Sequence, residues 1–132
     1  MSTPEGRLET LFSTGIRRGL KGKTLKLAPT EAGAPDRLVL LAGLPPLLVE
    51  LKAPGGRLRA IQRVWHEEAH ELGHPVTVLS SEEEVLGWLT RLANDLPNLP
   101  RACPNRHVRA YIITRSGKRV CSACRTTRTS RT

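Results

Sequence analysis

The sequence predicts an α/β domain with the element order α-β-β-β-α-β-α, followed by a basic tail. Apolar residues recur at helical spacing in three segments, which predicts three helices. Short apolar runs bounded by Gly and Pro predict the strands between them. The chain has 132 residues but only one Phe, one Tyr and two Trp, so we expect one modest domain with a mainly aliphatic core.

The first helix is expected to begin at Thr3, whose side chain can cap the helix before Pro4 at its first position. Apolar residues then keep helical spacing up to Ile16, and the glycines between residues 19 and 22 end the segment. Residues 25–27 predict a short strand.

Residues 38–41 and 47–49 are apolar runs separated by a Gly/Pro break, which is typical of a β-hairpin. Because both of its faces are apolar, this hairpin should be central and buried. Asp36 precedes the first run, and Glu50 and Lys52 end the second. With the turn centred near residue 44, we expect Asp36 opposite Lys52, with Glu50 as its diagonal neighbour.

Charged groups at the ends of a buried hairpin indicate chemistry. Two neighbouring carboxylates, from Asp36 and Glu50, can share a hard cation such as Mg²⁺, which prefers oxygen ligands. A buried carboxylate pair is costly unless a cation compensates it. Lys52 could orient or activate a nucleophile beside the metal. The pattern therefore favours metal-dependent phosphodiester cleavage.

Beyond the hairpin, residues 57–72 predict a second helix that ends at Gly73. Residues 75–79 predict a strand, and Ser81 begins a third helix with a capping-box pattern. Residues 97–100 read as a linker. Five residues of the second helix are expected to face inward: Leu58, Ile61, Trp65, Ala69 and Leu72.

The second helix also carries polar candidates. Gln62 lies one turn after Leu58, and from there its amide could reach back to the hairpin ends and bond a water or the lysine. His66, His70 and His74 share i, i+4 spacing, which invites a metal site. Since glutamates lie on the same face and Gly73 precedes His74, we expect a solvated polar face instead.

The net charge of +9 is confined to the last quarter of the chain. Acidic and basic residues balance over residues 1–100, whereas residues 101–132 contain nine Lys and Arg and no acid. Such a tail predicts a polyanion partner bound through phosphate neutralisation, although a basic tail can also serve only solubility. Because no long apolar run or signal-like segment is present, a soluble cytoplasmic protein without a membrane partner is expected.

All three cysteines lie in this tail, in a Cys-x3-His and Cys-x2-Cys arrangement. Zinc favours four tetrahedral Cys and His ligands, and a strip this short would depend on the metal for folding energy. The alternative is a reduced, disordered tail with incidental cysteines. The expected structural Zn²⁺ ligands are Cys103, His107, Cys121 and Cys124.

Several segments together resemble the VRR-NUC family of small phage-type nucleases, a branch of the PD-(D/E)xK superfamily. The resemblance covers about residues 5–92. It is carried by Gly33-Ala34-Pro35-Asp36-Arg37-Leu38, Val49-Glu50-Leu51-Lys52-Ala53, Arg57-Leu58 with Gln62, Leu72-Gly73, and Ser80 with Glu83-Glu84-Val85.

The resemblance implies a restriction-endonuclease-like core, a mixed central sheet flanked by helices, and hydrolysis of DNA with Mg²⁺ or Mn²⁺. It also implies metal ligands at Asp36, Glu50 and the Leu51 carbonyl, a catalytic Lys52 and a supporting Gln62. The first-helix carboxylate of the family would be Glu9, with Glu5 as the alternative.

The predicted organisation is therefore a nuclease domain at residues 1–96, a linker at 97–100 and a basic zinc-binding tail at 101–132. We expect a DNA endonuclease, in the host cytoplasm if a phage encodes it. The alternative is a non-catalytic nucleic-acid-binding protein that uses the basic zinc tail. A homodimer would supply the two active sites needed to cut both strands at once.

Overall fold

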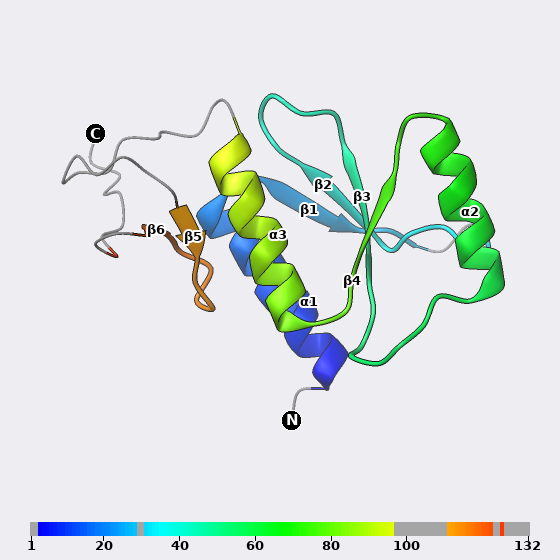
Figure 1. The fold of residues 1–132 in the computed structure, drawn as a ribbon, viewed down its shortest axis with the longest axis horizontal. Helices are drawn as coiled ribbons and strands as arrows, with labels where there is room; N and C mark the ends of the chain where they lie inside the picture. Colours follow the sequence, from blue (N-terminus) through cyan, green and yellow to red (C-terminus); the bar gives the residue numbers. More distant parts are fainter. Residues whose placement is uncertain (1–2, 29–30, 97–110, 123–124, 126–132) are drawn as a thin grey trace.

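The computed structural model describes residues 3–28, 31–96, 111–122 and 125. The predicted order of elements is confirmed, and a second, small sheet follows it (Figure 1). The elements are α1 (Pro4–Thr14), the π-helical turn η1 (Gly15–Gly19), β1 (Lys23–Lys26), β2 (Arg37–Leu40), β3 (Leu47–Leu51), α2 (Ala60–Glu71), β4 (Val76–Leu79), α3 (Glu82–Asp95), β5 (Tyr111–Ile113) and β6 (Arg119–Cys121).

The helix starts follow from local chemistry. The Thr3 hydroxyl accepts a hydrogen bond from the Gly6 N–H at 2.9 Å, and Ser81 caps α3 by accepting from the Glu84 N–H at 3.1 Å. Both caps satisfy backbone donors that the first helical turn leaves unpaired.

The main sheet is mixed and has the order β1-β2-β3-β4, so the predicted hairpin strands β2 and β3 are central. The β1–β2 and β2–β3 pairs are antiparallel and the β3–β4 pair is parallel. This architecture matches the mixed, helix-flanked sheet that the sequence led us to expect.

The expected hairpin register was wrong by two positions. Arg37 pairs with Val49, so Asp36, one residue earlier, aligns with Glu50 rather than with Lys52. The reason is the turn, which is centred on Gly43 with a left-handed φ of 83° rather than on Leu44. Glycine adopts this conformation without steric cost, and the shift brings the two carboxylates closer in register.

One face of the sheet packs on α1 and α3, which lie side by side in Figure 1. Phe12 of α1 and Trp88 of α3 stack with ring centroids 5.6 Å apart. A side chain at Gly15 would collide with Leu89, since a Cβ there would lie 2.4 Å from Leu89 Cδ1. Helix α3 therefore approaches η1 closely, and the core lies between these helices and the sheet.

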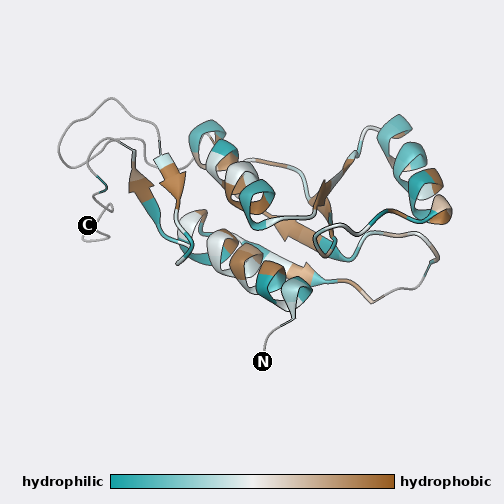
Figure 2. Ribbon diagram, turned by 60° about the horizontal axis from the view of Figure 1, so that its bottom comes forward, coloured by the Kyte–Doolittle hydropathy of each residue, from teal (hydrophilic) through white to brown (hydrophobic). Residues whose placement is uncertain are grey.

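The other face of the sheet is covered in part by α2, and here the predicted inward residues were partly wrong. Ile61 is 49% exposed and Leu72 is 78% exposed, whereas Gln62 and Ala69 are buried. Figure 2 shows α2 as mainly hydrophilic and set apart from α1 and α3. The helix contacts the sheet through a narrow strip, so it cannot bury a full apolar stripe.

The hairpin of β5 and β6 packs on α3 and shares the main core. The Asn94 side chain accepts from the Tyr111 N–H at 2.8 Å and donates to the Tyr111 carbonyl at 2.9 Å. Tyr111, Ile113 and Cys121 are buried in the same apolar cluster as Phe12. The part of the predicted tail that forms β5 and β6 therefore packs against α3 and belongs to the main core.

Of the predicted zinc ligands, Cys103, His107 and Cys124 lie outside the described residues, and Cys121 is buried at the end of β6. Among the helices that the structure describes, none has the length and apolar character needed to cross a membrane.

Candidate active site

Asp36 and Glu50 meet at the end of the two central strands. Asp36 precedes β2 directly, and its Oδ1 accepts a hydrogen bond from the Leu51 N–H at 3.3 Å. Glu50 lies within β3 and is only 5% exposed. Side chains alternate along a strand, so Glu50 and Lys52 project to the face opposite to Val49 and Leu51, which lie in the main core.

Both carboxyl groups are held in an unfavourable environment for charge. Burial, as the larger cause, and the neighbouring Asp36 charge together raise the pKa of Glu50 from 4.5 to about 7. Burial also raises the pKa of Asp36. Glu50 Oε1 is shielded from solvent and has no hydrogen-bond partner among the described residues. A buried acceptor without a partner costs free energy that a bound cation would recover.

Cationic side chains border the pair on the same face. Lys52 Nζ lies 3.9 Å from Glu50 Oε2, an ion pair that is too long for a normal hydrogen bond. Lys52 and Arg59 both lower the pKa of Glu50, but burial and the charge of Asp36 outweigh them. Arg59 is the N-cap residue of α2, so the start of this helix faces the carboxylates.

The loop before Asp36 is fixed by α2. Gly33 has a left-handed φ of 91°, and a Cβ there would lie 2.5 Å from the Ile61 carbonyl oxygen. Trp65 Nε1 donates a hydrogen bond to Glu31 Oε1 at 3.2 Å. The close approach requires glycine. Through this contact, α2 packs against the segment that leads to Asp36.

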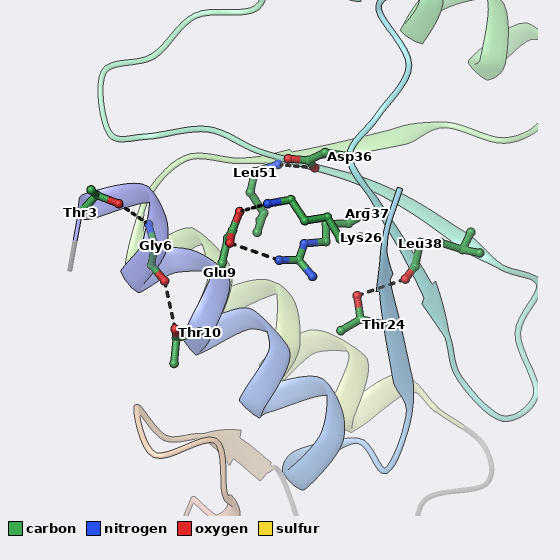
Figure 3. A network of polar contacts seen from close by, with 10 residues as sticks. All are labelled: Thr3, Gly6, Glu9, Thr10, Thr24, Lys26, Asp36, Arg37, Leu38 and Leu51. Atoms are coloured by element: carbon green, nitrogen blue, oxygen red, sulfur yellow. Dashed lines mark hydrogen bonds and ion pairs between the residues drawn. The ribbon is translucent and has the colours of Figure 1, made fainter. Parts of the chain in front are cut away.

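Glu9, the expected first-helix carboxylate, forms two ion pairs at the face of the sheet on which α1 packs. Its Oε1 lies 3.4 Å from Lys26 Nζ and its Oε2 lies 3.5 Å from Arg37 Nη2 (Figure 3). The charge of Glu9 raises the pKa of Asp36, and the charge of Glu5 raises that of Glu50. Both candidate glutamates of α1 are therefore electrostatically coupled to the pair.

Gln62 is 4% exposed on α2 and performs a local task. Its Oε1 accepts a hydrogen bond from the Arg59 N–H at 2.8 Å, which closes the first turn of the helix. The side-chain oxygen is thus engaged with the backbone, and the NH₂ group is the end that can donate. The sequence indicated the residue but not this capping contact.

The solvated polar face that the sequence predicted for the three histidines is confirmed except at His66. His70 and His74 are exposed, whereas His66 is half-buried and its Nε2 is shielded from solvent. Burial is the larger cause that lowers the pKa of His66, and the Lys52 charge lowers it as well. The i+4 spacing from Gln62 was the signal that could have indicated this neighbour of Lys52.

The arrangement combines acidic oxygen ligands with a nearby ammonium group. Across the described part of the chain, no three His, Cys, Asp or Glu side chains gather closely enough to surround a metal ion. The pair of Asp36 and Glu50 is the acidic centre, and carboxylate oxygens suit Mg²⁺ or Mn²⁺ rather than a soft metal. Lys52 supplies a positive charge next to it.

Comparison with known proteins bears on the fold and on the class of activity. No family model matches the chain. "Putative nuclease p44" of Acyrthosiphon pisum secondary endosymbiont phage 1 is 40% identical over 57 residues, which are 43% of this chain. The match spans 61% of the length of that relative, less than two thirds of it.

A solved structure described as "VRR_NUC domain" aligns with a TM-score of 0.60 and 28% sequence identity. The alignment covers 72% of this chain and 99% of that chain. Almost the whole of the known domain is therefore reproduced here. The chain has the α/β fold of a VRR_NUC domain and is similar in sequence to a phage protein named as a nuclease.

Proposed function

We propose that this protein is a divalent-metal-dependent endonuclease that hydrolyses phosphodiester bonds in DNA. The observation that carries the proposal is the pair formed by the half-buried Asp36 and the buried Glu50. Both pKa values are raised, and Glu50 Oε1 has no partner among the described residues. Lys52 lies beside the pair. The likeness to a VRR_NUC domain and to a phage protein named as a nuclease supports the same chemistry.

The residues present fit Mg²⁺ or Mn²⁺. The carboxylates of Asp36 and Glu50 would hold the cation, with the backbone carbonyl of Leu51 as a third ligand. When bound, such a cation stabilises negative charge on a phosphate and lowers the pKa of a coordinated water. Glu9 is proposed as a further carboxylate of the site, and it would exchange its ion pair with Arg37 for this role.

The side chains of this chain contribute orientation and charge. Lys52 places its ammonium group where it can align a nucleophile and compensate the charge of the scissile phosphate. Gln62 fixes the start of α2, because its Oε1 accepts a hydrogen bond from the Arg59 N–H. Because Gly33 packs against α2, the helix also fixes the loop that carries Asp36.

We propose a structural Zn²⁺ bound by Cys103, His107, Cys121 and Cys124. The nine Lys and Arg residues of positions 101–132 would hold DNA phosphates around it. Cys121 ends β6 within the core, so such a site would connect the tail to the domain. Metal analysis tests it: one equivalent of zinc in the wild-type protein and its loss in Cys103→Ser are expected, and a wild-type protein without zinc would refute it.

Cleavage assays test the enzyme assignment. Supercoiled, linear and branched DNA would be incubated with Mg²⁺ or Mn²⁺ and with the wild type, Asp36→Asn, Lys52→Met or Glu71→Gln. The first two variants should cut at least about a hundredfold more slowly, since each removes a group that acts on the reacting phosphate. Glu71→Gln alters an exposed carboxylate of α2 and should cut like the wild type.

A measurement of Mn²⁺ binding separates ligand loss from general damage. Asp36→Asn should weaken binding strongly, whereas Lys52→Met and Glu71→Gln should retain it. Cleavage at the wild-type rate by Asp36→Asn would contradict the assignment as a metal-dependent nuclease. The basic tail favours one alternative, a non-catalytic nucleic-acid-binding protein, which would retard DNA in gels without nicking it under any of these conditions. Sedimentation of the wild-type protein would show whether two sites act together in a homodimer.

A further inference from the structure

His66 occupies a position that the proposed function does not use. It lies one helical turn after Gln62, and residues four apart on a helix share a face. Gln62 is buried at 4% exposure, so this face of α2 is turned toward the protein. His66 is half-buried there, whereas His70, one further turn along, is exposed.

His66 lies on the side of α2 that carries the buried Gln62, toward the sheet face from which Lys52 projects, and it has an unused polar atom. Its Nε2 is shielded from solvent and has no hydrogen-bond partner among the described residues. Burial lowers the pKa of this histidine, and the Lys52 charge lowers it as a second cause, so both favour the neutral imidazole. A neutral imidazole has one nitrogen with a free lone pair, which makes it a hydrogen-bond acceptor.

Lys52 has donors to offer this acceptor. Its ammonium group carries three N–H donors. The ion pair with Glu50 Oε2 is 3.9 Å long and therefore does not engage a donor in a normal hydrogen bond. The shielded Nε2 acceptor of His66 and the ammonium group of Lys52 lie between α2 and the same face of the sheet, so they are suited to form a hydrogen bond.

We propose that His66 is a positioning residue for Lys52, whose ammonium group donates a hydrogen bond to the His66 Nε2 lone pair in the working site. The contact would hold the flexible lysine stem against α2 and aim the charge at the substrate phosphate. The inference rests on the proposed nuclease function for the role of Lys52, but the contact itself can be tested without activity.

The first test is ¹⁵N NMR of the histidine rings at pH 7.5. The His66 signals are assigned by their loss in His66→Gln. Replacing Lys52 by Met should move the His66 Nε2 resonance toward the value of a free lone pair and leave the His70 resonances in place. Identical His66 resonances in the wild type and Lys52→Met would overturn the inference, whatever the protein does to DNA.

The second test measures cleavage kinetics in variants of matched size. His66→Phe fills the space without an acceptor and should lower kcat roughly tenfold to hundredfold with little change in KM, the effect of one hydrogen bond to a charged group. His66→Gln offers an amide oxygen in a similar position and should recover most of the rate. His70→Phe serves as the matched control and should be unchanged.

The outcomes separate the two proposals. If Lys52→Met is inactive but His66→Phe cuts like the wild type, His66 has no positioning role and the nuclease assignment stands. If the wild type does not cut DNA, the nuclease assignment fails and the NMR result alone decides the contact. Thermal unfolding of each variant excludes loss of fold, and an inactive, folded His66→Phe with an equally inactive His66→Gln would contradict the acceptor role.

Discussion

Helices α2 and α3 have similar lengths and flank the same sheet, yet they bury different kinds of side chain. Helix α3 covers the core face with Val85, Trp88, Leu89 and Ala93. Helix α2 buries a glutamine and an alanine, and leaves Ile61 and Val64 about half exposed. The comparison indicates that the two helices have different roles. Helix α3 contributes most to stability, whereas α2 packs less completely and presents polar groups toward the carboxylates.

The largest effect expected from this comparison is on stability. Leu89→Ala on α3 should lower the free energy of unfolding by about 2–5 kcal/mol, because Leu89 is fully buried and its loss leaves a cavity. Ile61→Ala on α2 should cost about 0.5 kcal/mol or less, since that side chain is half exposed. Urea unfolding followed by circular dichroism measures both. Equal losses would mean that α2 is packed as tightly as α3.

A second, smaller effect concerns the hairpin that α3 supports. Asn94→Ala removes both hydrogen bonds to the backbone of Tyr111, in a partly buried place, and should destabilise the protein by about 1–3 kcal/mol. Asp95→Ala, the exposed neighbour, is the matched control and should change little. Hydrogen exchange at the Tyr111 amide should accelerate in Asn94→Ala alone. Unchanged protection would show that apolar contacts hold the hairpin without this clamp.

The sequence predicted the features that depend on near neighbours. Caps at Thr3 and Ser81, and the order of elements, follow from short-range patterns, and the structure confirms them. Asp36 and Glu50 stood out because charged groups at the ends of a buried hairpin are costly, which is visible without coordinates. The structure brings these two carboxylates together.

Features that depend on distant contacts were missed. The strand register was wrong because Gly43, rather than the following residue, centres the turn, and a shift of this kind leaves the apolar pattern almost unchanged. The apolar positions of α2 predicted an inward stripe, but periodicity does not reveal how much core a sheet face offers. The roles of His66 and Asn94 arise from residues far away in sequence, Lys52 and Tyr111.

The smallest expected effect concerns the carboxylates that α2 faces. It is the pH dependence of stability, measured in metal-free buffer with a chelator. Glu50 has a folded pKa of about 7 against 4.5 as its ordinary value, so the folded state binds more protons between these limits. Its contribution to stability is therefore greatest below about pH 4.5 and is lost as the pH rises to about 7. Asp36, whose pKa is also raised, acts in the same direction.

Glu50→Gln should flatten this decline in melting temperature between pH 5 and pH 7.5, because the amide does not titrate. Mg²⁺ or Mn²⁺ should also flatten it in the wild type, since a cation that binds the folded state stabilises the ionised pair. Leu89→Ala lowers stability at every pH without changing the slope, because no titrating group is involved. A wild-type slope that neither Glu50→Gln nor the metal reduces would place the titrating groups elsewhere, and α2 would then cover an ordinary polar surface.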